Sequence, residues 1–228
     1  MTKSNNINPE FTQKINQNLS ENNVFMKQLD KYFAGTMSPH EVINVCSTPN
    51  ILKLLHSTAK KVVLNQKDLR NAVSSPINHN TSHTEGHQIE ISEIYKLSDA
   101  IRNPILVLKG NDKNKNSVVL ITDLKNTINQ NVFVPISLDR QNGKINNIST
   151  LYGKKNIAKY LSLHTTDIIA INIEKAGMLA DTEVQFFQSI YDTVAHYDGS
   201  IAYSTQNVEG FNKIDRSSIF QCPHLSDL

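Results

Sequence analysis

The sequence predicts an α+β domain with an antiparallel sheet of about four to five strands, flanked by helices on its N-terminal side. Four runs rich in β-branched residues follow one another at 105–108, 117–124, 132–138 and 144–152. The segments between them are short and consist mainly of Gly, Asn, Asp and Lys, which favours antiparallel neighbours over crossover connections. We expect a fifth strand at 167–171.

The region before these runs predicts helices alternating with short strands. Apolar residues recur at helical spacing from Val24 to Phe33, and Gly35 ends that helix. Residues 1–23 predict only a weak helix or a mobile arm. A hydroxyl in Ser47-Thr48-Pro49 is expected to cap the next helix, with the proline in its first turn. The remaining elements expected here are strands at 41–46 and 61–65 and helices at 50–56, 66–73 and 89–101.

The chain divides into three predicted parts. Residues 1–35 form an N-terminal arm and helix, residues 36–180 the α+β domain, and residues 181–228 an acidic extension. Helices are expected at 154–163, 174–179 and 183–194. No period is visible from residue 196 onward, which predicts an irregular C-terminal segment.

Composition excludes several classes of protein. No run of 18 or more apolar residues exists, so no transmembrane helix is expected, and the first residues lack the apolar stretch of a signal peptide. Cys46 and Cys222 are too few for a disulfide scaffold and indicate reduced thiols. We therefore expect a cytoplasmic protein without a membrane partner.

Charge is unevenly distributed along the chain. Residues 104–164 carry nine basic and three acidic side chains, for a net charge of +6, whereas residues 165–228 carry three basic and nine acidic ones, for −6. The basic segment suits an anionic ligand on the predicted sheet. The alternative is that the two segments pack against one another as a neutral whole.

Four ordered segments carry a family resemblance. Residues 99–108, 117–124, 132–138 and 145–154 resemble the C-terminal domain of phage MuF-type head proteins and its relatives in phage polyvalent proteins. The resemblance extends over roughly residues 40–180. Those domains are grouped with the barnase–EndoU–colicin–RelE nucleases, which implies a barnase/RelE-like fold and a metal-independent RNase toxin that needs no cofactor. It also implies RNA and an immunity or antitoxin protein as partners, and action in bacterial cytosol, including delivery into a target cell.

Metal-independent RNA cleavage requires a base for the 2′-hydroxyl, a cation near the phosphate and an acid for the leaving oxygen. Histidine suits the acid or base role because its ordinary pKa lies near neutrality. Relatives carry a lysine shortly before a Lys-His pair, and His87 of this chain matches the histidine although no lysine precedes it. His87 is therefore the first catalytic candidate, with an ordinary loop histidine as the alternative.

Further candidates lie on the predicted strands. Asn146, Ser149 and Tyr152 lie on the last run, and Thr122 on the second. Positions 146, 148, 150 and 152 share one face of a regular strand, but the apolar residues of this run do not, so we expect a bulge or a strand end near Asn147. Tyr152 suits base stacking or donation to phosphate; as the alternative, it closes the rim of the core.

Basic residues next to these strands are candidates for substrate binding, because cations neutralise backbone phosphates. The alternative for each of them is an ordinary solvated surface position. The candidates are Lys125, Lys144, Lys154 and Lys155.

A metal site is a weaker hypothesis. His79, His83 and His87 recur every fourth residue, which on a helix would align three ligands. The segment is rich in Asn, Thr, Ser and Gly, which are poor helix formers, and the glutamate of the zincin motif is displaced. No metal is therefore expected.

Three functions remain open from the sequence. The first is an RNase that cleaves RNA by general acid/base chemistry. The second is a non-catalytic module on the same fold that binds nucleic acid or a protein. The third is an effector that acts on a small nucleotide-like molecule.

Overall fold

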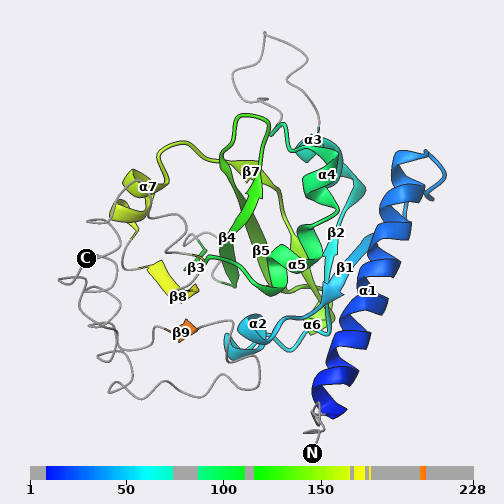
Figure 1. Ribbon diagram of the computed structural model, residues 1–228, viewed down its shortest axis with the longest axis horizontal. Coiled ribbons are helices and arrows are strands. Elements are labelled where there is room, and N and C mark those ends of the chain that lie inside the picture. The colour runs from blue at the N-terminus through cyan, green and yellow to red at the C-terminus, as the bar shows by residue number, and fades with distance from the viewer. Residues whose placement is uncertain are drawn as a thin grey trace, which may run out of the picture.

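The computed structural model describes residues 9–73, 87–110, 116–164, 167–172, 175 and 201–203, and shows one mixed sheet flanked by helices (Figure 1). The strands run in the order β1-β2-β6-β5-β4-β3-β8-β9, and β7 pairs with β5. The strands are β1 (Ile43–Ser47), β2 (Lys61–Leu64), β3 (Leu106–Lys109), β4 (Ser117–Lys125), β5 (Asn131–Asp139), β6 (Ile145–Ile148), β7 (Tyr152–Gly153), β8 (Ile168–Asn172) and β9 (Ile201–Tyr203). The helices are α1 (Pro9–Phe33), α2 (Asn50–Leu54), α3 (Gln66–Val73), α4 (Ile91–Ile94), α5 (Leu97–Arg102), α6 (Arg140–Gly143) and α7 (Ile157–Leu163).

The centre of the sheet confirms the predicted antiparallel neighbours. Strand β3 pairs with β4, β4 with β5 and β5 with β6, all antiparallel, and the expected fifth strand β8 pairs antiparallel with β3. The short polar connections therefore form reversals of the chain, as their composition indicates.

The sheet is larger than the four to five strands expected. Strand β2 pairs parallel with β6, and this pairing joins the antiparallel pair of β1 and β2 to the central strands. Residues 201–203, expected to be irregular, form β9, which pairs parallel with β8. Both additions are parallel pairings between segments distant in the chain, so no short connection marks them in the sequence.

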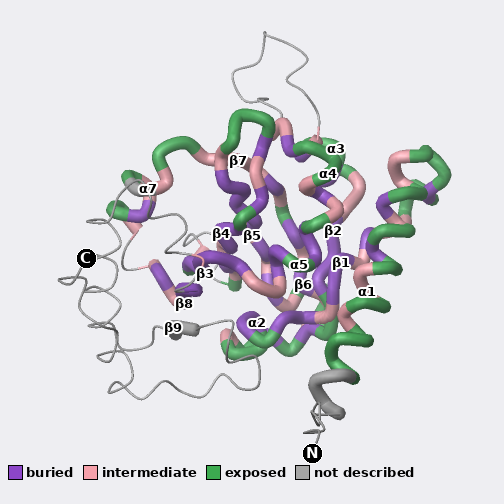
Figure 2. Tube along the Cα trace, viewed as in Figure 1, coloured by how far each residue is buried: buried purple, intermediate pink, exposed green. Residues whose placement is uncertain are grey.

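Alternation along β5 divides the interior into two clusters. The even-numbered residues Val132, Val134, Ile136 and Leu138 pack in the larger cluster with residues of α1, α2, α3, α4 and α5. Phe133 packs in a smaller cluster with Leu161 of α7. Figure 2 shows the resulting band of buried positions along the central strands and exposed positions along α1. Since side chains alternate between the faces of a strand, the odd-numbered residues of β5 lie on the face that α7 covers at one end.

The structure decides between two alternatives for one helix and corrects two other expectations. Of the weak helix and the mobile arm left open for residues 1–23, the helix is observed over residues 9–23, continuous with the helix expected at 24–33, and Phe25 and Leu29 anchor α1 in the core. The helix expected at 89–101 is two short helices, α4 and α5, with a turn between them. Helix α2 follows Pro49 without a side-chain cap, because the Thr48 hydroxyl instead accepts a hydrogen bond from the buried Asn146.

Helix α1 satisfies free backbone groups at the sheet edge formed by β1. The Asn44 N–H donates to Gln28 Oε1 at 2.9 Å, and the Ser47 N–H donates to Glu21 Oε2 at 3.0 Å. Arg102 of α5 donates to the same Glu21 oxygen at 2.8 Å. An edge strand whose donors are occupied is protected from pairing with another chain. None of the helices in the described residues is apolar enough over a sufficient length to cross a membrane.

The Arg102–Glu21 pair is expected to stabilise the fold more than a solvated ion pair does. The side chain of Arg102 is 15% exposed and that of Glu21 24%, whereas Lys96, paired with Glu93, is 64% exposed. Replacing Arg102 leaves a partly buried carboxylate without its cation, so Arg102→Met should lower the free energy of unfolding by about 2 kcal/mol. The control Lys96→Met should lower it by less than about 0.5 kcal/mol. Urea unfolding at pH 7 measures both, and equal losses would contradict the account.

Candidate functional site

A row of five aromatic rings lies where β5, β7 and α7 meet. Tyr152 is the cross-strand partner of Phe133, and their rings stack with centroids 5.6 Å apart at 25°. Tyr160 of α7 meets Phe133 edge-on at 5.4 Å, and His164 follows Tyr160 at 4.3 Å. His87 meets Tyr152 from the other side at 5.6 Å. We call these five residues the aromatic row.

His87 lies at one end of the aromatic row, held by both its backbone and its ring. Its N–H donates to the Asn71 carbonyl at the end of α3 at 3.4 Å, and its Nε2 lies 3.4 Å from Thr150 Oγ1. The side chain is half-buried, and burial lowers the pKa of the imidazole below its ordinary value. His87 is therefore mainly neutral at pH 7, the state in which it accepts a proton.

Burial shifts the pKa of Tyr152 in the opposite direction. Burial of the phenol, with a further contribution from Tyr160, raises the pKa of Tyr152 to about 12. The hydroxyl therefore keeps its proton at neutral pH and can act as a donor. A neutral imidazole and a protonated phenol thus lie beside each other.

Lys154 adds a cation to the aromatic row. Its Nζ lies 3.9 Å from the centroid of the Tyr160 ring and 5.9 Å from that of Phe133. Such contacts with ring faces hold an ammonium group by cation–π attraction. Lys154 forms none of the ion pairs in the described residues. Its charge is therefore not neutralised by a carboxylate in this part of the chain.

The other end of the row holds a second histidine, which the sequence analysis missed. His164 Nδ1 lies 2.8 Å from Asp167 Oδ2, and both side chains are partly exposed. Burial raises the pKa of Tyr160, and the Asp167 charge raises it further. The four-residue spacing of Tyr160 and His164, where His164 directly follows the predicted helix, was the available signal, since this spacing brings side chains together on one helical face.

Two of the predicted catalytic residues are fully buried and have internal partners. Asn146 accepts hydrogen bonds from the Ser57 hydroxyl and the Asp139 N–H, and it donates to Thr48. Thr122 donates to the Val132 carbonyl at 2.8 Å. These bonds occupy both side chains within the fold, at a distance from solvent.

Ser149 lies on the open part of the sheet face. It is exposed, its Oγ is 3.1 Å from that of Ser137, and its N–H donates to the Pro135 carbonyl. Strand β6 ends at Ile148, which confirms the strand end expected near Asn147, and β7 resumes pairing at Tyr152. Tyr152 consequently shares a face with Phe133, rather than with Asn146 and Ile148 as it would in a regular strand.

The four predicted substrate-binding lysines are spread over the domain. Lys154 belongs to the aromatic row, and Lys155 follows it on an exposed position. Lys144 is exposed near the opposite end of β5. Lys125 Nζ donates to Asn131 Oδ1, and its backbone N–H to Glu93. The structure therefore brings one of the four into contact with the row.

The metal alternative has no support within the described residues. His79 and His83 lie outside them, and the described ranges contain no cluster of three or more His, Cys, Asp or Glu able to hold a metal ion. The helices expected at 174–179 and 183–194 likewise fall outside what the structure describes, apart from residue 175.

Comparison with protein families supports a phage-related domain. Residues 78–176 match the family model of the phage MuF C-terminal domain. The match contains all five members of the aromatic row, Lys154 and Asp167, whereas α1, β1, α2, β2 and α3 precede it. No curated protein and no solved structure matches the chain.

The low pKa of His87 predicts a measurable titration. The imidazole of His87 should have a pKa of about 6.5 in the unfolded chain and a lower pKa in the folded protein. Between the two values the unfolded state binds more protons, so stability present above the unfolded pKa is lost as pH falls through the folded pKa. Histidine ring NMR of the native and urea-unfolded protein measures the two midpoints, and loss of one resonance in His87→Gln assigns the signal. A native midpoint at or above the unfolded one would contradict the account.

Proposed function

We propose that this chain binds RNA on the open sheet face and cleaves it without a metal ion, as a phage-type RNase toxin. The observation that carries the proposal is a half-buried His87 with a lowered pKa beside a protonated Tyr152, with the Lys154 cation at the same row of rings. These groups supply the base, the donor and the cation that the reaction requires. The net charge of +6 over residues 104–164 supports an anionic substrate.

The proposed reaction is an internal transfer at one phosphodiester. Neutral His87 takes the proton of the 2′-hydroxyl, and that oxygen forms a bond to phosphorus while the bond from phosphorus to the 5′-oxygen breaks. Tyr152 donates its proton to the leaving 5′-oxygen, and Lys154 stabilises the charge on the phosphoryl oxygens. The products are a 2′,3′-cyclic phosphate and a 5′-hydroxyl. Proton return from the imidazolium restores the phenol.

Binding without cleavage is the second candidate. The aromatic row combines the Lys154 cation with the partly exposed rings of Tyr152 and Tyr160, and rings beside a cation stack unpaired bases whatever their sequence. His164, the other histidine of the row, is separated from His87 by three intervening rings, so the row does not place two imidazoles at one phosphate. An acidic immunity or antitoxin protein would also suit this face.

Cleavage of RNA in the presence of EDTA tests the first candidate against the second. The parent protein should cleave labelled total bacterial RNA, and His87→Ala should reduce the rate by about 10²–10⁴-fold because the general base is lost. Tyr152→Phe, which keeps the stacked ring and removes the hydroxyl, should also slow cleavage while leaving RNA affinity unchanged. His40→Ala, at an exposed position outside the aromatic row, is the matched control.

The outcomes of this experiment separate the RNase from the binding module. Salt-sensitive binding by the parent without any cleavage would overturn the RNase and favour the binding module. Cleavage that survives in His87→Ala would remove His87 from the mechanism. If the parent protein neither binds nor cleaves RNA, both candidates are contradicted.

A further inference from the structure

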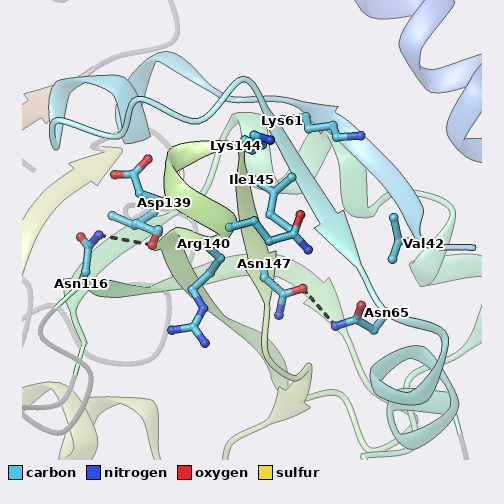
Figure 3. Close-up of a pocket in the computed structure, with 11 residues that line it drawn as sticks. Val42, Lys61, Asn65, Asn116, Asp139, Arg140, Lys144, Ile145 and Asn147 are labelled. Atoms are coloured by element: carbon cyan, nitrogen blue, oxygen red, sulfur yellow. Dashed lines mark hydrogen bonds between the residues drawn. The ribbon is translucent and has the colours of Figure 1, made fainter. Parts of the chain in front are cut away.

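A second basic site lies at the other end of β5. A pocket of about 790 Å³ opens where β2, β6 and the β5–β6 turn meet (Figure 3). Three basic residues line the pocket: Lys61 of β2, whose Nζ donates to Asn44 Oδ1 at 2.8 Å, and Arg140 and Lys144 of the turn. We call this pocket the basic pocket.

Asp139, the acidic residue that lines the basic pocket, is directed to neutral donors and forms no ion pair with these cations. Asp139 Oδ1 accepts hydrogen bonds from the N–H groups of Thr58 and Ala59, each at 2.9 Å, and from the hydroxyls of Ser57 and Thr58. Burial raises the pKa of this carboxyl, but these hydrogen bonds outweigh burial and hold the pKa below its ordinary value. No ion pair in the described residues includes Lys61, Arg140 or Lys144.

The turn that carries Arg140 and Lys144 is held in one conformation. Asp139, Gln141 and Asn142 have φ of 51°, 53° and 58°, and Gly143 has 79°. Left-handed backbone persists in residues other than glycine when surrounding contacts enforce it. Here the Asp139 carboxylate and its N–H, which donates to the buried Asn146 at 3.0 Å, provide those contacts. The two cations are thus presented on a preorganised turn.

The basic pocket and the aromatic row lie on one face of the sheet. Phe133 and Asp139 are both odd positions of β5, and Asn147 is the cross-strand partner of Ser137. Six steps along the strand lead from Phe133 to Asp139, a distance of about 20 Å. Between them Pro135 and Ser137 are partly exposed and Ser149 is exposed, which leaves an accessible strip of surface connecting the two sites.

The lining of the basic pocket favours phosphate over an apolar ligand. Besides the three cations, it is lined by Asn65 and Asn147, whose side chains join through a 3.0 Å hydrogen bond. Their amide donors have partners in Asp68, Asn147 and the Ile148 carbonyl, so the cations are the groups left to bind backbone phosphates. The pocket is larger than one phosphate, so a stretch of phosphodiester backbone fits its size and chemistry.

We propose that the basic pocket binds the backbone phosphates of the same single RNA strand that the aromatic row engages, several nucleotides from the scissile bond. The inference rests on the proposed function, because it states how the proposed RNA substrate lies along β5 and that it must be long enough to reach both sites. Long single strands reach both sites, whereas a short one reaches only the row. The pocket therefore contributes to affinity for long RNA and not to the chemical step.

Binding of two RNA lengths to a cleavage-deficient background tests the proposal. Fluorescein-labelled oligouridylates of about twelve and about three nucleotides are titrated against His87→Ala and against His87→Ala carrying K61Q, R140Q and K144Q. The added substitutions should weaken binding of the long strand about 10–100-fold and reduce the salt slope of log K by about 2, since each lost single-strand phosphate contact removes about 0.7. Affinity for the short strand should not change. In the parent background, the same three substitutions should raise KM for the long strand and leave kcat unchanged.

A charge-matched control separates the pocket from net charge. K27Q, K31Q and R70Q remove two lysines and one arginine from exposed positions of α1 and α3. Urea unfolding of both triple variants shows whether they remain folded. Equal losses of affinity in both triple variants, or no loss in the pocket variant, would overturn the proposed role of the basic pocket. Either result would leave the proposed function standing. Absence of RNA binding by His87→Ala itself would overturn both.

Discussion

The position of Tyr152 depends on one extra residue between β6 and β7. Ile148 is paired with Ile136, and Tyr152 with Phe133, so four steps along one strand correspond to three along β5. Because side chains alternate, this extra residue moves Tyr152 to the face opposite Asn146 and Ile148. The buried amide of Asn146 can therefore hold the turn from inside the fold, while Tyr152 stacks on the buried Phe133 on the other face of the sheet.

Strand β5 organises the same face at its other end. Its even positions are occupied by the larger core, so its odd positions carry Phe133 to the aromatic row and Asp139 to the turn above the basic pocket. Burial then determines protonation: the imidazole of His87 is kept neutral and the phenol of Tyr152 protonated by the same loss of solvent. Helix α1 is anchored on the opposite side of the core and occupies donors of the β1 edge, which leaves the face with the row to ligands.

The sequence was informative where structure is local. Runs of β-branched residues and short polar turns predicted the antiparallel centre, and the spacing of residues 66–73 predicted α3 with its observed bounds. The register shift before Tyr152 also had a local signal, because the apolar residues of 144–152 predicted an interruption near Asn147. The sequence did not predict strand pairings and side-chain contacts that form only through tertiary packing. The parallel pairing of β2 with β6 has no local signal. For the same reason Tyr160 and His164 were missed, because they join the row only once α7 packs on Phe133.

The central claim is that RNA lies along the open face of β5, from His87 to the turn after Asp139. Amide NMR shift mapping of His87→Ala with a single-stranded RNA of about twelve nucleotides, in EDTA, tests it most directly. The account predicts that the largest shifts fall in residues 147–160 and in the turn at 140–144, with α1 unchanged. Shifts concentrated on α1, or none at saturating RNA, would contradict it.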